Sequence, residues 1–297
     1  MNNLISLVMR DIKIFYRTKG NIFFSMLSVI ILVVLHFAIF QNTTTDAWAA
    51  GMQYVPIIQR EHLLWLADSL MFSAIIPIGS VTISLTTLGL MVSDREKNTL
   101  SDFLVSPIGR NSLMASYLIS SFIVGFIMLL GFIMFFQFYF LIMYGIGFSL
   151  SQLSMILLVT VGALIFGNIF ILLLISFFKT QQALSAVGAI VGVTMGFISG
   201  AYIPIGLFGE TTANIFSALP FAQIAVLSRI AFMHRLEYVT PLTHEMLSGE
   251  IARTFGFELW IGNHHIPTMG ILLIASGTTA LLLVLLIIIF AKMKKAD

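Results

Sequence analysis

The sequence predicts an all-α integral membrane protein. The expected parts are six transmembrane helices, an N-terminal amphipathic interface helix, a cytoplasmic coupling helix and re-entrant outer helices before the last span. Of the 297 residues, 59% are hydrophobic and only 9% are charged, whereas soluble proteins carry about 25% charged residues. This composition excludes a cytosolic enzyme, a nucleic-acid binder and a disordered chain. Because the chain has no cysteine, disulfides, thiol catalysis and cysteine-bound metals are excluded too.

The first twenty residues predict an amphipathic helix at the cytoplasmic membrane surface. Apolar residues recur at helical spacing on one side and basic residues share another face. The apolar set is Leu4, Val8, Ile12 and Phe15, and the basic set is Arg10, Lys13 and Arg17. No small-residue cleavage site follows the first apolar run, so a cleavable signal peptide is not expected. The helix could anchor the chain and fix its topology, or it could dock a cytoplasmic partner.

Six apolar runs are long enough to cross a bilayer, which takes about 20 residues. They occupy residues 21–40, 69–92, 113–144, 152–178, 181–202 and 268–291. The turn from Gly145 to Ser149 divides the long uncharged stretch into the third and fourth spans. With no repeat and no linker, residues 1–297 are expected to form a single membrane domain.

The distribution of basic residues predicts that both termini are cytoplasmic. On that topology eleven of the fifteen Lys and Arg residues lie inside, and four lie in the longer outer segments, including residues 203–267. The inner set is Arg10, Lys13, Arg17, Lys19, Arg95, Lys97, Arg110, Lys179, Lys292, Lys294 and Lys295.

Residues 93–112 form the predicted cytoplasmic coupling loop. Thr99 with Asp102 fits a capping box, and Asn98 tolerates the left-handed conformation at a helix end. A helix from Thr99 would carry an apolar side before Pro107 stops it. That side consists of Leu100, Phe103 and Leu104. The loop could be a plain charged connection, but a capped helix with an apolar side suggests a surface that a partner holds.

Four glycines recur at spacings of four in the fifth span. They are Gly188, Gly192, Gly196 and Gly200. Such a stripe lets another helix backbone approach closely, so it is expected to serve packing within the chain, a subunit interface or the wall of a pathway. Pro204 breaks the helix just beyond the stripe, and Pro220 interrupts the apolar stretch that follows, which favours re-entrant or interfacial helices.

Few polar side chains fall within the spans. His36 lies near one end of the first span and Asp68 at the mouth of the second, while Gln137 and Asn168 are amides expected to bond between helices. Proton- or sodium-coupled transport usually needs more ionisable groups than this. The pair His264-His265 is a weak metal candidate, and no metal site is predicted. No Gly-x-x-x-x-Gly-Lys-Ser/Thr phosphate loop occurs, so ATP binding of that kind is not expected.

The run from Ser93 to Leu100, followed by Leu104 to Pro107, resembles the permeases of type-2 ATP-binding-cassette (ABC) exporters. Their typical form is acidic-Arg-Glu-x-Gly-Thr-Leu and then Leu-x-Ser-Pro, and here Asn98 replaces the usual glycine. The break from Ser199 to Pro204 and the later Leu219-Pro220-Phe221-Ala222 are similar to the family as well.

This resemblance implies a permease without catalytic residues or its own ATP site. It would pair with a second copy or a paralogue, and cytoplasmic ABC ATPase subunits carrying ATP and Mg would dock on it. The implied coupling residues are Arg95, Glu96, Thr99, Leu100, Phe103 and Leu104, together with Arg10, Lys13 and Arg17. The expected packing or pathway residues are Gly188, Gly192, Gly196, Gly200, Pro204 and Asn168.

The expected cargo is a lipophilic drug, an antimicrobial peptide or a lipid-like molecule, exported across the cell membrane. Two alternatives stay open at this point. One is an ATPase-independent secondary transporter or channel, and the other is a membrane sensor or assembly subunit.

Overall fold

The computed structural model describes residues 2–51, 58–99, 109–244, 247 and 249–296. Within these residues six helices are long and apolar enough to cross a membrane. The chain is therefore an all-α membrane protein, which confirms the predicted fold class.

The first half of the chain forms long helices. They are α1 (Asn2–Arg17), α2 (Lys19–Leu35), the π-helical turn η1 (His36–Phe40), α3 (Gln41–Gly51), α4 (Arg60–Glu96), α6 (Arg110–Tyr144), α7 (Leu150–Ile175) and α8 (Gln181–Ile198). The elements of the second half are shorter until the last helix. They are the 3₁₀ turn η2 (Ile205–Leu207), α9 (Glu210–Ala218), α10 (Pro220–Phe232), α11 (Leu236–Val239), α12 (Glu250–Phe255), β1 (Leu259–Ile261), β2 (His264–Ile266) and α13 (Thr268–Ala296).

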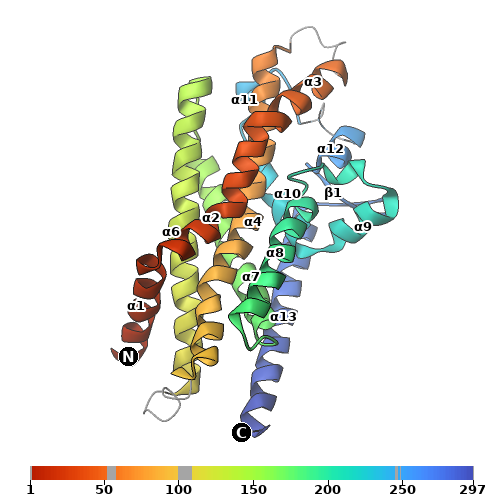
Figure 1. Ribbon diagram of the computed structural model, residues 1–297. Helices are drawn as coiled ribbons and strands as arrows, with labels where there is room; N and C mark the ends of the chain where they lie inside the picture. The colour runs from red at the N-terminus through yellow and green to blue at the C-terminus, as the bar shows by residue number, and fades with distance from the viewer. Residues whose placement is uncertain (1, 52–57, 100–108, 245–246, 248, 297) are drawn as a thin grey trace.

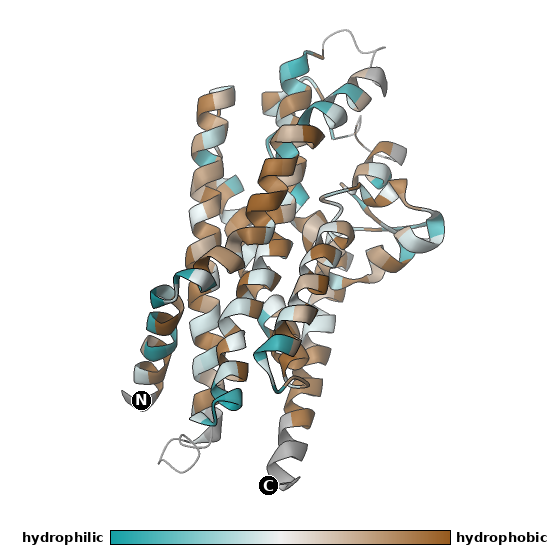
Figure 2. Ribbon diagram, in the orientation of Figure 1, coloured by the Kyte–Doolittle hydropathy of each residue, from teal (hydrophilic) through white to brown (hydrophobic). Residues whose placement is uncertain are grey.

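Helix α4 lies at the centre of the bundle. It packs against α2, α3, α6, α7, α8 and α10. In its most apolar stretch 78% of the residues are buried, against 11% in α13, which lies at the periphery. Figure 2 shows hydrophobic residues along the middle of the long helices and hydrophilic ones gathered toward their ends. The core therefore forms around α4, and α13 presents its apolar side chains outward.

Several predicted span boundaries differ from the structure; α4, for example, begins at Arg60 rather than at residue 69. The helix that begins at Lys19 runs on through η1 and α3 to Gly51, beyond the predicted end at residue 40. Hydropathy marks only the apolar part of a helix, and the polar residues after Phe40 do not stop its backbone hydrogen bonding. Helix α8 ends at Ile198, because Gly200 adopts a left-handed conformation with φ of 67°. Gly200 thus lies outside the helix that carries the other three glycines.

The segment before the last span contains a sharply bent helix pair. Helix α9 meets the helical segment from Pro220 to Val239 at 83°. Pro220 stands at the start of α10, where its missing backbone N–H costs no hydrogen bond. Helix α10 is buried against α4 and α7. An antiparallel hairpin, with Leu259 opposite Ile266, follows α12, and sequence analysis did not anticipate it.

The two ends of the bundle differ in what they gather. The start of α1, the C-terminal end of α4 and the turn between α7 and α8 lie toward one end, here called the basic end (residues 2–19, 93–99 and 176–181). Helices α3, α11 and α12 lie toward the other end, here called the opposite end (Figure 1). The C-terminal part of α13 also lies toward the basic end.

Candidate coupling site

A buried carboxylate organises the basic end. Asp94, in the last turns of α4, accepts hydrogen bonds from Arg10 Nη2 at 2.8 and 3.0 Å and from the Tyr117 hydroxyl at 2.6 Å. Arg10 belongs to α1 and Tyr117 to α6. Charge-assisted hydrogen bonds of this kind are roughly twice as strong as neutral ones. Asp94 therefore ties α1 to α4 and α6 at one point.

A second acidic residue extends this network. Asp11 lies 3.1 Å from Arg10 Nη1 and accepts a hydrogen bond from Ser116 Oγ at 3.2 Å. Burial raises the pKa of Asp11 to about 6, although the neighbouring Arg10 guanidinium acts in the other direction. The polar side of α1 thus faces α6 as well as solvent, whereas Leu7, Val8 and Phe15 form its buried apolar contacts.

Arg95 and Glu96 hold the turn between α7 and α8. Arg95 Nη1 donates to the carbonyl oxygen of Phe178 at 2.7 Å, just beyond the end of α7. Glu96 Oε2 accepts from the backbone N–H of Gln181 at 3.0 Å, at the first residue of α8. Cations are favourable at a helix C-terminus and anions at an N-terminus. Gln181 Nε2 in turn donates to the carbonyl oxygen of Gly89 in α4 at 2.5 Å.

The structure describes six of the nine predicted coupling residues. Arg10, Arg95 and Glu96 bond within the chain, as described above. Lys13 and Arg17 on α1 are exposed. Thr99 is partly exposed, and Leu100, Phe103 and Leu104 lie outside the described residues. Asn98 adopts the left-handed conformation, with φ of 59°, directly after α4 ends, as its residue type suggested.

Sequence reasoning missed the centre of this network. Asp94 falls within the predicted coupling loop, residues 93–112, without a predicted role of its own, and Asp11, Ser116 and Tyr117 belong to no predicted site. The available signal was their position: Asp94 is the first residue of the charged run and so the one nearest to the apolar span, and Tyr117 is a polar residue in a stretch without charge. Arg10 and Tyr117 lie 84 and 23 residues from Asp94 along the chain, so only the fold brings the three side chains together.

A second polar cluster surrounds Asp68 toward the opposite end of α4. Its Oδ1 lies 2.6 Å from His36 Nε2 and accepts from Gln41 Nε2 at 2.8 Å. Its Oδ2 accepts from the hydroxyls of Tyr139 and Tyr144 at 2.7 and 2.5 Å. His36 opens the π-helical turn η1, a feature often found at functional positions. The two ionisable residues that the sequence left apart are thus one buried pair joining η1, α3, α4 and α6.

The two amides that were expected to form hydrogen bonds between helices form different hydrogen bonds. Asn168 Nδ2 donates to the carbonyl oxygen of Leu164 in its own helix at 2.8 Å, and its Oδ1 is buried without a partner among the described residues. Gln137 Oε1 accepts from the backbone N–H of Phe148 at 2.6 Å and so holds the turn after α6. Neither amide bonds across two spans.

The glycine stripe meets side chains within the chain. A Cβ added at Gly188 would lie 2.6 Å from a Leu85 methyl group, and one at Gly192 would lie 3.3 Å from Ser28 Oγ. At Gly196 it would meet the ring of Tyr202 in the same segment. At these three glycines the nearest atoms among the described residues belong to side chains, which fits packing within the chain; the roles of the stripe in a subunit interface or a pathway wall stay predictions.

Close backbone approach occurs instead at Gly167 of α7. A Cβ there would lie 3.0 Å from the carbonyl oxygen of Ser80 in α4. The absence of a side chain at this residue lets α7 pack directly on the backbone of the central helix. Pro204 lies in the loop between α8 and η2, where its carbonyl oxygen accepts from the backbone N–H of Leu207 at 3.0 Å.

Comparison with known proteins connects these features to a family. Neither the curated proteins nor the solved structures gave a match. Residues 2–233 match the family model described as ABC-2 type transporter. This model describes the membrane component of such a transporter. The match includes α1, the run at the end of α4 and all but the last of the six candidate spans. This multi-pass chain therefore belongs to the ABC-2 type transporter family and is a permease of an ABC transporter.

Proposed function

We propose that this permease works in an ATP-driven exporter that moves a lipophilic drug, an antimicrobial peptide or a lipid-like molecule outward across the cell membrane. It acts with a second copy or a paralogue, in contact with the lipid bilayer and without nucleic acid. ATP and Mg are held by separate cytoplasmic ATPase subunits, and no cofactor binds to this chain. The basic end faces the cytoplasm, because eleven of the fifteen basic residues fall on that side of the predicted topology.

The observation that carries this proposal is the linkage at the end of α4. Three consecutive residues, Asp94, Arg95 and Glu96, bond to α1 and α6, to the end of α7 and to the start of α8 respectively. A displacement of residues 93–99 by a docked ATPase would thus reach several helices at once. Coupling over long distances needs such a contiguous network of hydrogen bonds and rigid helices.

The surface available to an ATPase subunit is basic. Lys13, Arg17, Lys97 and Lys179 are all exposed at the basic end. Complementary charge on a partner accelerates association and selects the correct orientation. An acidic docking face on the ATPase is therefore the expected counterpart.

Co-purification tests the docking surface. The permease is co-expressed with an ATPase encoded beside it, and the pair is captured through a tag on the permease. Replacing Lys13 and Arg17 together with glutamate should lower the recovered ATPase about tenfold, since two attractive charges become repulsive. Arg60→Glu is the matched control: Arg60 is an exposed basic residue that pairs with Asp46 at 2.7 Å at the opposite end. Undiminished recovery with the double variant would refute the docking site.

Direction and energy source need a separate measurement. In proteoliposomes holding the permease and the ATPase, transport of a fluorescent lipophilic cation should require ATP on the side of the basic end. A secondary transporter would instead move cargo without the ATPase. Among the described residues, His36 and Asp68 are the ionisable pair that most resembles an ion-binding site. Both carboxylate oxygens of Asp68, however, already accept hydrogen bonds from protein groups, so they are not free to bind an ion. Transport that persists without ATPase and ATP would favour that alternative.

A further inference from the structure

The outer region after α8 contains a partly open polar cavity of about 640 Å³. Its walls come from α9, from α12 and from the β1–β2 hairpin, with η2 and α10 contributing apolar residues. Binding sites for small ligands typically occupy about 300–1,000 Å³. The cavity is therefore large enough for a small organic ligand, and it lies in a region to which sequence analysis assigned no role.

One face of α9 lines this cavity. Glu210, Ala213, Asn214 and Ser217 are spaced so that they fall on the same side of the helix, and all four border the cavity. Three of them are polar, although this chain has few polar residues to place. Asn214 Oδ1 also accepts from the backbone N–H of Gly262 at 2.8 Å, which fixes α9 against the hairpin turn.

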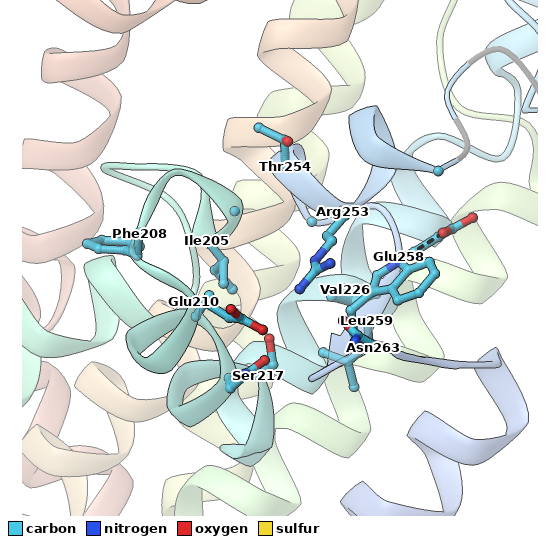
Figure 3. Close-up of a pocket in the computed structure, with 16 residues that line it drawn as sticks. Ile205, Phe208, Glu210, Ser217, Val226, Arg253, Thr254, Glu258, Leu259 and Asn263 are labelled. Atoms are coloured by element: carbon cyan, nitrogen blue, oxygen red, sulfur yellow. Dashed lines mark hydrogen bonds between the residues drawn. The ribbon is translucent and has the colours of Figure 1, made fainter.

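Opposite charges reach into the cavity from two sides. Figure 3 shows Arg253 of α12 and Glu210 of α9 projecting into it, with Ser217 beside Glu210. Within the part of the chain that the structure describes, these two groups do not form an ion pair. Arg253 Nη2 donates to the carbonyl oxygen of Gly262 at 3.2 Å, and its guanidinium lies 5.7 Å from the Trp260 ring centre. Arg253 is thus positioned by the hairpin while its charge stays available to a ligand.

The walls are held in place before any ligand arrives. At Gly206 of η2, an added Cβ would collide with the backbone of Thr254, so η2 and α12 are in direct backbone contact. Trp260 Nε1 donates to Glu258 at 3.1 Å, which fixes the indole at the rim. Preformed sites lose less conformational entropy on binding. Apolar residues, among them Phe208, Val226 and Leu259, complete the lining.

From this arrangement we propose that the cavity binds a zwitterionic ligand, a short peptide with free ends, outside the transport pathway. Its carboxylate pairs with Arg253 and its ammonium group with Glu210. A purely anionic ligand would be repelled by Glu210 and by Glu258, which also lines the cavity, and a purely cationic one would leave the charge of Arg253 without a partner. The amides of Asn214 and Asn263 and the hydroxyls of Ser217 and Thr254 suit peptide groups, while the apolar lining suits aliphatic side chains. A phosphate zwitterion is the competing chemistry that the experiment separates.

Calorimetric titration of the full chain in nanodiscs tests this site. The probe is a four-residue peptide of alanine and leucine, compared in free, N-acetylated and C-amidated forms. For the intact chain, blocking either end should weaken binding about tenfold, the effect of losing one charge-assisted hydrogen bond. Glu210→Gln should weaken binding of the free peptide about tenfold and leave binding of the N-acetylated peptide as in the intact chain. Arg253→Gln should show the same relation to C-amidation.

Matched controls keep this test independent of folding. Glu61→Gln changes an exposed glutamate in the first turn of α4, as Glu210 is an exposed glutamate in the first turn of α9, and it should bind the free peptide normally. If Arg253→Gln fails to fold, Arg253→Lys takes its place in the test. This variant keeps the positive charge and should retain part of the affinity for the free peptide. The proposal is overturned if the free peptide does not bind, if acetylation and Glu210→Gln weaken binding multiplicatively, or if glycerophosphoethanolamine competes as well as the peptide.

Discussion

Helix α4 carries one buried carboxylate near each end, and the two are built differently. Asp94 at the basic end bonds to α1 and α6, and Asp68 toward the opposite end bonds to η1, α3 and α6. Each cluster therefore links the N-terminal helices to the same pair of helices, α4 and α6. Helices α4 and α6 are thus joined by buried carboxylates at two levels, to α1 at the basic end and to η1 and α3 toward the opposite end.

The two clusters differ in their access to solvent. The side chains of His36 and Asp68 are 3% and 0% exposed, whereas the side chain of Arg10 is 26% exposed. Breaking the Asp68 cluster would leave several donors without any acceptor, and breaking the Asp94 cluster would leave a guanidinium that water can still reach. We call the cluster around Asp68 the fixed joint, because its buried groups cannot exchange their partners for water. We call the cluster around Asp94, where we propose that the ATPase docks, the adjustable joint, because water can reach Arg10.

The largest expected effect is at the fixed joint. Asp68→Asn keeps the shape of the side chain, but its amide nitrogen cannot accept hydrogen bonds, so the two donors that share one carboxylate oxygen, such as the Tyr139 and Tyr144 hydroxyls, lose their acceptor. Each buried donor left without an acceptor costs about 1–3 kcal/mol, so the unfolding free energy should fall by about 2–6 kcal/mol. Unfolding in sodium dodecyl sulfate followed by circular dichroism would measure it. A loss no larger than that of the exposed-pair variant Asp46→Asn would contradict the fixed joint, because surface pairs contribute about 1 kcal/mol or less.

The corresponding change at the adjustable joint should cost less stability. Asp94→Asn removes the partner of Arg10, but the guanidinium can hydrate, so we expect a loss of about 1–3 kcal/mol. Its larger effect should be on function: ATP-driven transport should fall at least tenfold at equal expression, since α1 is no longer tied to α4. Transport per folded molecule in proteoliposomes is the measurement. Unchanged transport would show that this joint is only structural.

The sequence predicted the outline of the fold and part of the site. Hydropathy located the six spans because apolar length is a local property, and the residue type of Asn98 indicated its left-handed conformation. The clusters could not be predicted in this way. His36 and Asp68 lie 32 residues apart, and their pairing depends on the continuation of the first helix through the π-helical turn at residues 36–40. Neither composition nor periodicity reveals such a turn.

The glycines illustrate the same limit. Four glycines in register suggested close helix packing, yet among the described glycines of the spans it is Gly167, which belongs to no stripe, whose added Cβ would meet the backbone of another span. Which glycine meets a backbone depends on how two helices cross, and this is a tertiary property.

Two glycine variants compare how closely α7 packs on α4 with how closely α8 packs on α2. Gly167→Ala would place its Cβ 3.0 Å from the carbonyl oxygen of Ser80, a backbone atom that cannot move aside. We expect a loss of about 1–2 kcal/mol from overpacking. Gly192→Ala would meet only Ser28 Oγ at 3.3 Å, which can rotate, so the gain in helix propensity should leave stability unchanged or slightly higher. Equal losses in detergent unfolding would mean that α8 packs as tightly as α7.

The smallest effect concerns pH and the adjustable joint. Burial raises the pKa of Asp11 from 3.8 to about 6 in the folded chain, so the folded state holds its proton more strongly than the unfolded state. The stability that this proton contributes is fully present below about pH 4 and is lost as the pH rises through about 6. Asp11→Asn stays neutral, so it should be more stable than the intact chain at pH 7.5, by on the order of 1 kcal/mol. The difference should shrink at pH 5, whereas Asp46→Asn should show no such trend. Thermal unfolding at both pH values measures this, and a gap that widens on acidification would show that Asp11 is held as an anion.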